Sequence, residues 1–360
     1  MAAAPTLGPI TAAEAMTPAF ERTKQQLFRP FRFSHWWRLA LTALLAGEMG
    51  SGGNFHGGNW NLPGRHDKGK DFFLMAAPPW MDWHAYLGVI VVAVVLGLLL
   101  GIVFIYISSV FRFILFDSVL TERVHIREGW RRWQERGGRF FLWQIGFAAV
   151  MITLVGLVIG LPVLYAFRGG MFDHADEHVG ALVLGGFLML FVGGGLLIAS
   201  ALVGVFTKDF VVPLMALEEL GAIEAWRRLL PMLKSEKGSY AGYIGMKIVL
   251  AIASGIVFGI LSIIVLLILA IPLAILGILG VAAAAALGIT WNPLTIVLAV
   301  LVGAAVLFGL LWVMAMIMVP AVVFFQSYTL LFFGSRYARL GAMLAPPAPP
   351  APPAAVPALA

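Results

Sequence analysis

Residues 248–335 form an unbroken stretch of 88 residues without one Asp, Glu, Lys, Arg or His. A soluble domain needs charged side chains on the surface that faces water, so a stretch of this kind is not expected in one. In a bilayer the absence is expected, because a charge at mid-depth costs several kcal/mol. The whole chain agrees, since 61% of its residues are hydrophobic and only 12% are charged. We therefore predict an all-α fold, a polytopic bundle of transmembrane helices.

The length of each uncharged segment indicates how many times the chain crosses the membrane. A spanning helix needs about 20 apolar residues, and residues 85–111, 140–167 and 179–207 each exceed that without a charge. Pro272 and the Trp291–Asn292–Pro293 cluster divide the longest stretch. We expect a fifth span there over about residues 240–270 and a sixth over residues 294–322.

Two segments leave the number of crossings open. The first span, within residues 34–52, has only nine uncharged residues between Arg38 and Glu48. It can cross only if Arg38 extends its side chain toward the interface. The apolar connection over residues 273–290 could be re-entrant, an extension of the fifth helix, or a seventh crossing. We favour about six spans.

The sequence predicts three regions with different relations to the membrane. Residues 1–33 alternate aromatic and basic side chains and are expected to form an amphipathic interfacial segment. The transmembrane domain is expected over residues 34–340, with a Gly-rich outer loop at 50–83. The Pro- and Ala-rich residues 341–360 are expected to be a disordered tail.

The distribution of basic residues predicts the orientation of the chain. With six spans, 20 of the 24 Lys and Arg residues fall in the terminal segments and in the loops on the same side. Cytoplasmic loops carry this excess, so both termini are expected in the cytoplasm of a bacterial cell, with the chain in its inner membrane. The basic residues flank spans, which argues against a nucleic-acid partner despite a net charge of +6.

An internal repeat connects the two middle basic segments. The sequence that starts at Phe116 aligns with the one that starts at Val211, and Trp130-Arg131-Arg132 falls on Trp226-Arg227-Arg228. A fainter third copy matches Val212-Pro213 with Val319-Pro320. The predicted unit is a helical hairpin followed by an amphipathic interfacial helix, and three such units account for six spans.

The Trp-Arg-Arg motifs are the candidate binding residues. Tryptophan prefers the depth of the lipid headgroups, and each basic residue near an anionic leaflet contributes on the order of 1 kcal/mol. The motifs therefore indicate either an ordinary anchor beside the membrane or specific contact with lipid headgroups. The candidate residues are Trp130, Arg131, Arg132, Trp226, Arg227 and Arg228.

The residues inside the predicted spans argue against ion-coupled transport. Such proteins place ionisable groups within the membrane, whereas the clearly predicted spans contain none and Glu48 is expected at the outer interface. Pairs of glycines with GxxxG spacing, at positions 97/101, 156/160 and 255/259, are expected to let helices pack closely.

A short acidic loop contains the motif closest to a metal site. His174, Glu177 and His178 form the pattern H-x-x-E-H, which on a helix could place two His ligands on one face for zinc. The loop has only about a dozen residues, so we expect a solvated acidic loop more than a metal site. No cofactor is predicted.

The segment EELGAIEAWRRLLPMLKSEKGSYAGYIG, within residues 218–245, is similar to the repeated element of the glycerophosphoryl diester phosphodiesterase membrane-domain family. The opening LFRPFRFSHWWRLALTALLAG resembles uncharacterised bacterial and archaeal membrane proteins. The resemblance implies a membrane domain of several hairpins. It does not imply the phosphodiesterase activity, because the His-Arg-Gly opening and the acidic catalytic set of the hydrolase are absent from this sequence.

These observations favour a non-enzymatic membrane scaffold or accessory protein. Its expected partners are anionic lipid headgroups, with a protein partner or a second copy of the chain as further candidates. The alternative is an uncoupled transporter or channel for a small or amphiphilic molecule. A zinc-dependent membrane hydrolase comes third.

Overall fold

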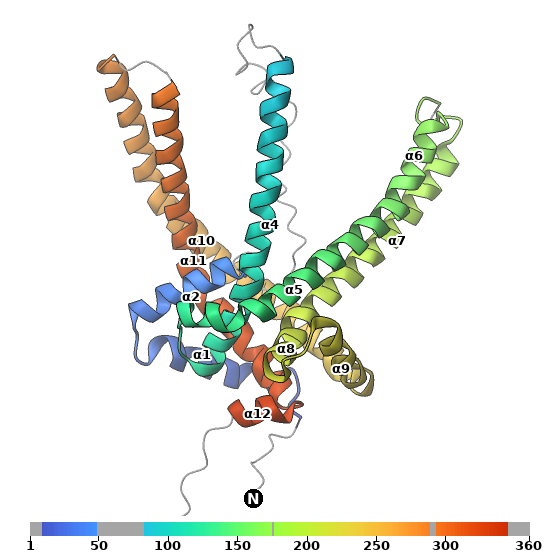
Figure 1. Ribbon diagram of the computed structural model, residues 1–360, viewed down its shortest axis with the longest axis vertical. Coiled ribbons are helices and arrows are strands. Elements are labelled where there is room, and N and C mark those ends of the chain that lie inside the picture. The colour runs from blue at the N-terminus through green and yellow to red at the C-terminus, as the bar shows by residue number, and fades with distance from the viewer. Residues whose placement is uncertain (1–8, 49–82, 175, 289–292, 345–360) are drawn as a thin grey trace, which may run out of the picture.

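Three apolar arms rise from a common base in the computed structural model, which describes residues 9–48, 83–174, 176–288 and 293–344 (Figure 1). The first arm is helix α4 (Trp83–Thr121). The second pairs a helix running through α5 (Ile126–Val155), η1 (Gly156–Gly160) and α6 (Leu161–Arg168) with α7 (Val179–Phe206). The third pairs α10 (Lys237–Ala286) with α11 (Pro293–Gly334).

The arms confirm the prediction of an all-α, membrane-embedded protein. Five helical stretches among the described residues are long and apolar enough to cross a bilayer. The most apolar window of each stretch has at most 17% of its residues buried within the protein. Side chains such as Leu98, Leu188 and Ile268 are more than 60% exposed. In a membrane these faces would contact lipid, where apolar surface carries no penalty.

The first predicted span is a short helix that lies at the base. Helix α2 (Phe33–Leu45) has 13 residues, about 20 Å at 1.5 Å per residue, which is less than the hydrocarbon core of about 30 Å. Trp36 Nε1 donates to the carbonyl of Met316 on α11 (3.0 Å), and Ser108 of α4 donates to the carbonyl of Ala46 (3.0 Å). Helix α2 alone is therefore too short to cross, and residues 49–52 of the predicted first span lie outside the described residues, so the described chain has five candidate spans.

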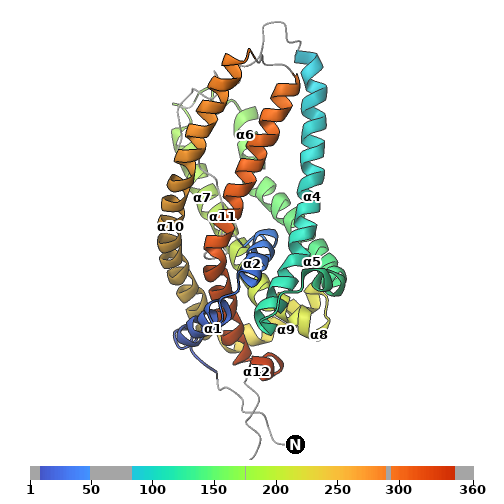
Figure 2. The ribbon, with the colours of Figure 1, turned by 90° about the vertical axis from the view of Figure 1, so that its left-hand side faces the viewer.

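The apolar connection after the fifth span belongs to that span. Helix α10 continues without interruption through Pro272 to Ala286, and α11 begins at Pro293. Of the alternatives left open by the sequence, the structure shows an extension of the helix. The two helices run side by side to the tip of their arm, which Figure 2 shows from a second direction.

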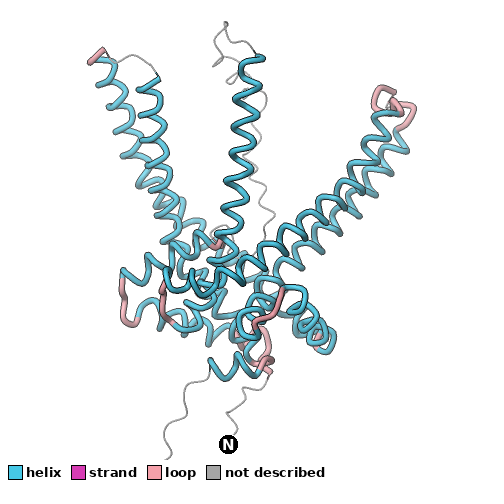
Figure 3. The backbone as a smooth tube through the Cα atoms, viewed as in Figure 1, coloured by secondary structure: helices cyan, strands magenta, loops and turns pink. Residues whose placement is uncertain are grey.

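The base gathers the inner ends of the arms and the short helices. It contains α1 (Met16–Phe28), α2, η2 (Thr207–Val211), α8 (Val212–Glu218), α9 (Ala222–Ser235) and α12 (Ala338–Leu344). Figure 3 shows these helices gathered below the arms. Its centre is aromatic, with Phe210 packed against Tyr240, Tyr243 and Phe333 at ring-centroid distances of 5.2–5.3 Å. The packed core of this chain is thus at the base.

The glycine pairs do not pack helices in the way the sequence suggests. A Cβ added at any of the six GxxxG glycines would meet no atom within 4 Å. The close helix contact is instead at Gly137 of α5, where a Cβ would lie 2.6 Å from Val110 Cγ2 and 2.8 Å from its Cα. These six glycines therefore face away from neighbouring helices.

The internal repeat is visible in the base. In both clear copies the chain breaks at a glutamate with positive φ, Glu122 (59°) and Glu219 (62°), and then starts the surface helix α5 or α9. Trp133 and Leu229, which occupy equivalent positions, are 2% and 0% exposed. The two surface helices therefore pack on the base with the same face.

Candidate functional site

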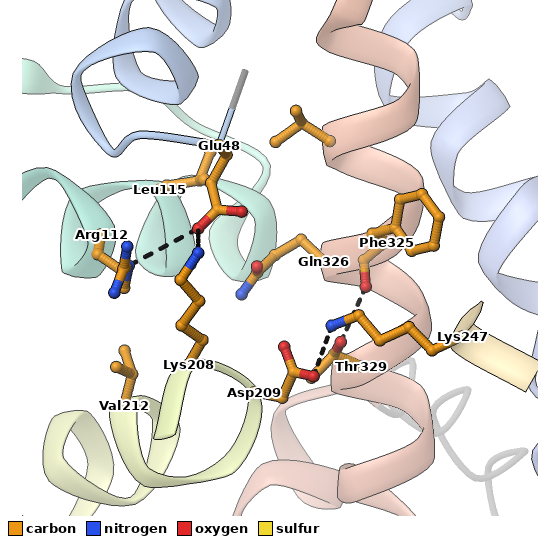
Figure 4. A pocket seen from close by; sticks show the side chains of 11 residues that line it. Glu48, Arg112, Leu115, Lys208, Asp209, Val212, Lys247, Phe325, Gln326 and Thr329 are labelled. Carbon is orange, nitrogen blue, oxygen red and sulfur yellow. Dashed lines mark hydrogen bonds and ion pairs between the residues drawn. The ribbon is translucent and has the colours of Figure 1, made fainter. Parts of the chain in front are cut away.

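The base contains a buried cluster of charged side chains where the three arms meet. Its lining comes from the segment after α2 and from α4, η2, α8, α10 and α11 (Figure 4). The charged members are Glu48, Arg112, Lys208, Asp209 and Lys247. An unpaired charge buried there would destabilise the fold, so the contribution of each charged side chain to stability depends on its partner.

One half of the cluster is centred on Glu48. Its carboxylate accepts from Lys208 Nζ at 3.1 Å, and Arg112 Nε lies 3.7 Å from the same oxygen. Burial raises the pKa of Glu48, but the charges of Lys208 and Arg112 outweigh it and lower the pKa to about 2. Glu48 is therefore ionised at neutral pH and lies beside the inner end of α4, not at the outer interface where the sequence suggested it.

The other half is centred on Asp209. Lys247 Nζ donates to Asp209 Oδ2 at 2.5 Å, and the hydroxyl of Tyr243 donates to the same oxygen at 2.9 Å. The Tyr243 hydroxyl is also 2.7 Å from the hydroxyl of Thr329 on α11. This chain of hydrogen bonds connects η2, α10 and α11.

The cluster encloses a small polar space. The cavity among these side chains is about 20 Å³, which is room for one or two water molecules. Gln326 of α11 lies between the two halves in Figure 4. The arrangement holds opposite charges together and can keep a water molecule.

The sequence did not reveal this cluster. Arg112 and Lys208 directly follow uncharged stretches and are expected in the adjoining loops, although each lies within a helix that continues from an arm into the base. Lys247 falls within the predicted fifth span and lies on α10, near the base. A usable signal was present, since Lys208-Asp209 directly follows an uncharged stretch of 29 residues and precedes Pro213. The π-helical turn at residues 207–211 carries this pair, and such turns often occur at functional sites.

The first Trp-Arg-Arg motif lies on α5 at the outside of the base. Trp130 packs against Tyr106 and Phe111 of α4, with ring centroids 6.1 and 5.8 Å apart. Arg132 is 3.9 Å from Asp117 on α4, and the side chains of Arg131 and Arg132 are both exposed.

The second motif, on α9, repeats this arrangement. Arg228 is 3.8 Å from Glu218 at the end of α8, and Arg227 is exposed. In each copy the second arginine reaches an acidic residue of the preceding helix, while the first has no carboxylate within ion-pair distance in the described chain. The two motifs lie on different helices and form two separate surfaces.

The H-x-x-E-H residues are at the far end of the second arm, away from the base. Residues 169–178 form turns between α6 and α7, apart from residue 175, which is not described. Within the described residues, no group of three or more His, Asp or Glu side chains is close enough to hold a metal ion. His174, Glu177 and His178 are therefore not brought together there.

Comparison with known proteins gives a family without an assigned activity. The model described as "Family of unknown function (DUF7544)" matches residues 10–343, which include all three arms and the base. No curated protein and no solved structure matches the chain.

Proposed function

The chain belongs to the DUF7544 family of unknown function, and we propose that it is a membrane scaffold or accessory protein whose base holds anionic lipid headgroups. The observation that carries the proposal is the pair of exposed arginines, Arg131 and Arg227, each next to a tryptophan on a surface helix. In both motifs the acidic residue of the preceding helix lies 3.8–3.9 Å from the other arginine, and Arg131 and Arg227 form no ion pair in the described chain. The exposed guanidinium is then available to a phosphate.

The depth of these residues in the membrane supports the proposal. On α4, side chains up to Ile105 are exposed and apolar, and burial begins near Ser109. Trp130 packs on Tyr106, within that transition. Because tryptophan concentrates at the interface, the motif on α5 lies at the depth expected for headgroups.

The orientation follows from the same charges. With the base on the cytoplasmic side of a bacterial inner membrane, both described ends of the chain are cytoplasmic, and Arg168 faces the other side. The positive-inside tendency favours this orientation. The exposed arms would then be surrounded by lipid, by a partner protein or by a second copy of the chain.

Lipid retention measured by native mass spectrometry tests the proposal. Protein released from detergent with equal amounts of phosphatidylglycerol and phosphatidylcholine should retain phosphatidylglycerol preferentially. The variant R131A/R132A/R227A/R228A should reduce this preference by about tenfold or more, since each cation contributes on the order of 1 kcal/mol. R168A, which removes one arginine at the tip of α6, away from the base, is the control. Unchanged retention in the quadruple variant would contradict the proposal.

The resemblance to the glycerophosphoryl diester phosphodiesterase membrane domain is consistent with this role. A hairpin membrane domain with basic surface helices can hold lipid phosphates without hydrolysing them. We therefore propose binding alone and carry over no hydrolase activity.

A second candidate function is uncoupled transport of a small or amphiphilic molecule. The buried charge cluster favours it, because charged groups inside membrane proteins often mark a pathway. Flux into proteoliposomes that the double variant D209N/K247M abolishes, with the fold retained, would support transport over the scaffold. If neither hydrophilic nor amphiphilic probes are transported, the result would favour the scaffold role.

A further inference from the structure

A pocket lined by arginines opens beside the first Trp-Arg-Arg motif. Its volume is about 610 Å³, within the range of ligand sites. Arg38 of α2 and Arg127 and Arg131 of α5 line it, together with His125 and Glu128. These residues come from segments about 90 positions apart, so the pocket forms only when α2 packs near the start of α5.

The three arginines differ from most others in the base. Seven arginines in the described chain form ion pairs with carboxylates, which are Arg22, Arg112, Arg132, Arg136, Arg139, Arg228 and Arg336. Arg38, Arg127 and Arg131 form none there, although Glu128 lines the same pocket. Three positive charges held together without carboxylate partners repel each other, and an anion would relieve that repulsion.

The position of the pocket indicates the kind of anion. Arg38 follows Trp37, whose ring lies 6.4 Å from Trp312 of α11, and Arg131 follows Trp130. Leu311 is 43% exposed and Ala315 is 1% exposed, so Trp312 marks the depth at which α11 enters the base. Trp37, beside Trp312, and Trp130 therefore lie where an arm meets the base, at the depth of lipid headgroups.

The first turn of α5 adds to the positive potential. Helix α5 begins at Ile126, and the preceding His125 makes no side-chain cap hydrogen bond. The free N–H groups of a first turn carry partial positive charge and favour phosphate. Arginine guanidinium groups bind phosphate oxygens in pairs.

We propose that this pocket binds a phosphate monoester, presented at the membrane surface by a lipid such as phosphatidic acid. Three arginines and one glutamate give these four side chains a net charge of about +2. That charge complements a dianionic monoester better than the single charge of a phosphodiester. This inference deepens the proposed function and rests on it, since it names the lipid class that one of the basic surfaces prefers.

The test compares two anionic lipids on the same protein. Wild type in detergent is mixed with equal amounts of phosphatidic acid, phosphatidylglycerol and phosphatidylcholine, and retained lipids are counted by native mass spectrometry. We expect phosphatidic acid to exceed phosphatidylglycerol. The variant R38A/R127A should lose that excess by about tenfold or more, because a charge-assisted hydrogen bond contributes about 1.5–3 kcal/mol. Arg123 is exposed, close in sequence and outside the pocket lining, so R123A is the matched control and should keep the excess.

The outcomes separate this inference from the proposed function. If wild type retains both anionic lipids equally, but more than phosphatidylcholine, the pocket inference fails and the proposed function stands. If neither anionic lipid exceeds phosphatidylcholine, both fail. The pocket inference is overturned if R38A/R127A keeps the wild-type excess of phosphatidic acid over phosphatidylglycerol. It is also overturned if R123A loses that excess to the same extent. Glycerol 3-phosphate, added as a soluble competitor, shows which kind of phosphate monoester the pocket prefers. If it displaces phosphatidic acid, the pocket binds a soluble phosphate; if it does not, the pocket binds the lipid.

Discussion

Lys247 Nζ on α10 lies 2.5 Å from Asp209 Oδ2 on η2, and both side chains are 7% exposed. The pair connects the second arm to the third, since η2 continues α7 and α10 rises into the neighbouring arm. Glu48, with Lys208 and Arg112, connects α2 and α4 to the same place. The arms have little contact above the base, so these two ion-pair groups help to fix how the arms are arranged.

Breaking the Asp209–Lys247 pair on one side should destabilise the base. K247M leaves the carboxylate of Asp209 buried with the Tyr243 hydroxyl but without its cation, and D209N leaves an ammonium group uncompensated. Each single variant should lower the free energy of unfolding by about 3–5 kcal/mol. The double variant D209N/K247M should recover much of the loss, because no buried charge of the pair remains. Unfolding in SDS, followed by tryptophan fluorescence, measures the differences.

The control for this cycle is an exposed pair of the same kind. Glu135 and Arg139 form an i,i+4 pair on α5 with side chains 77% and 51% exposed. The variant E135A/R139A should change stability by only about 0.3–0.5 kcal/mol. If the buried double variant were as unstable as its singles, the Asp209–Lys247 contact would not be what stabilises the base.

The low pKa of Glu48 predicts a pH dependence that E48Q removes. The pKa falls from 4.5 to about 2 on folding, so ionised Glu48 stabilises the fold above about pH 4.5. That contribution is lost as the pH falls toward 2. Wild type should have a higher Tm than E48Q at pH 6, and the difference should narrow at pH 3. E135Q, at an exposed site, should show no such narrowing. A difference that stays constant with pH would mean that Glu48 is not the titrating group.

The overall architecture could be predicted from the sequence because it depends on composition over long segments. Uncharged stretches of 27 to 29 residues at 85–111, 140–167 and 179–207 match helices α4, α5–α6 and α7. The internal repeat also predicted a separate interfacial helix at each Trp-Arg-Arg motif; α9 is such a helix, whereas α5 continues into the second arm. In these cases hydrophobic length and helical period alone determine the element.

The position of α2 and the charge cluster could not be predicted, because both depend on contacts between distant segments. The charge of Glu48 alone does not reveal that Lys208, 160 positions later, lies 3.1 Å away. Similarly, Arg38 suggested a residue at the end of a span, whereas packing places it beside Arg127 and Arg131 in a pocket. The prediction that helices pack closely at the GxxxG pairs was wrong for a related reason. Their spacing permits close packing but does not bring a second helix to them.

Gly137 predicts a sharp difference between two neighbouring substitutions. In G137A the new Cβ would lie 2.8 Å from Val110 Cα, which is backbone and cannot move away easily. We expect a loss of about 1–3 kcal/mol in the free energy of unfolding. In G138A the nearest atom would be Tyr106 Cε2 at 4.0 Å, so the better helix propensity of alanine should stabilise by up to about 1 kcal/mol. Equal effects of both substitutions in SDS unfolding would contradict the close α4–α5 contact.

The orientation of the base can be tested in cells because the chain contains no cysteine. Single-cysteine variants R131C and R227C probe the base, and R168C probes the tip of α6. If the base faces the cytoplasm, a membrane-impermeant maleimide should label R168C in intact cells. It should label R131C and R227C only after the membrane is permeabilised, because basic residues accumulate on the cytoplasmic side. Labelling of R131C or R227C from outside intact cells would place the arginines away from the anionic inner leaflet and remove the basis for the proposed lipid contact.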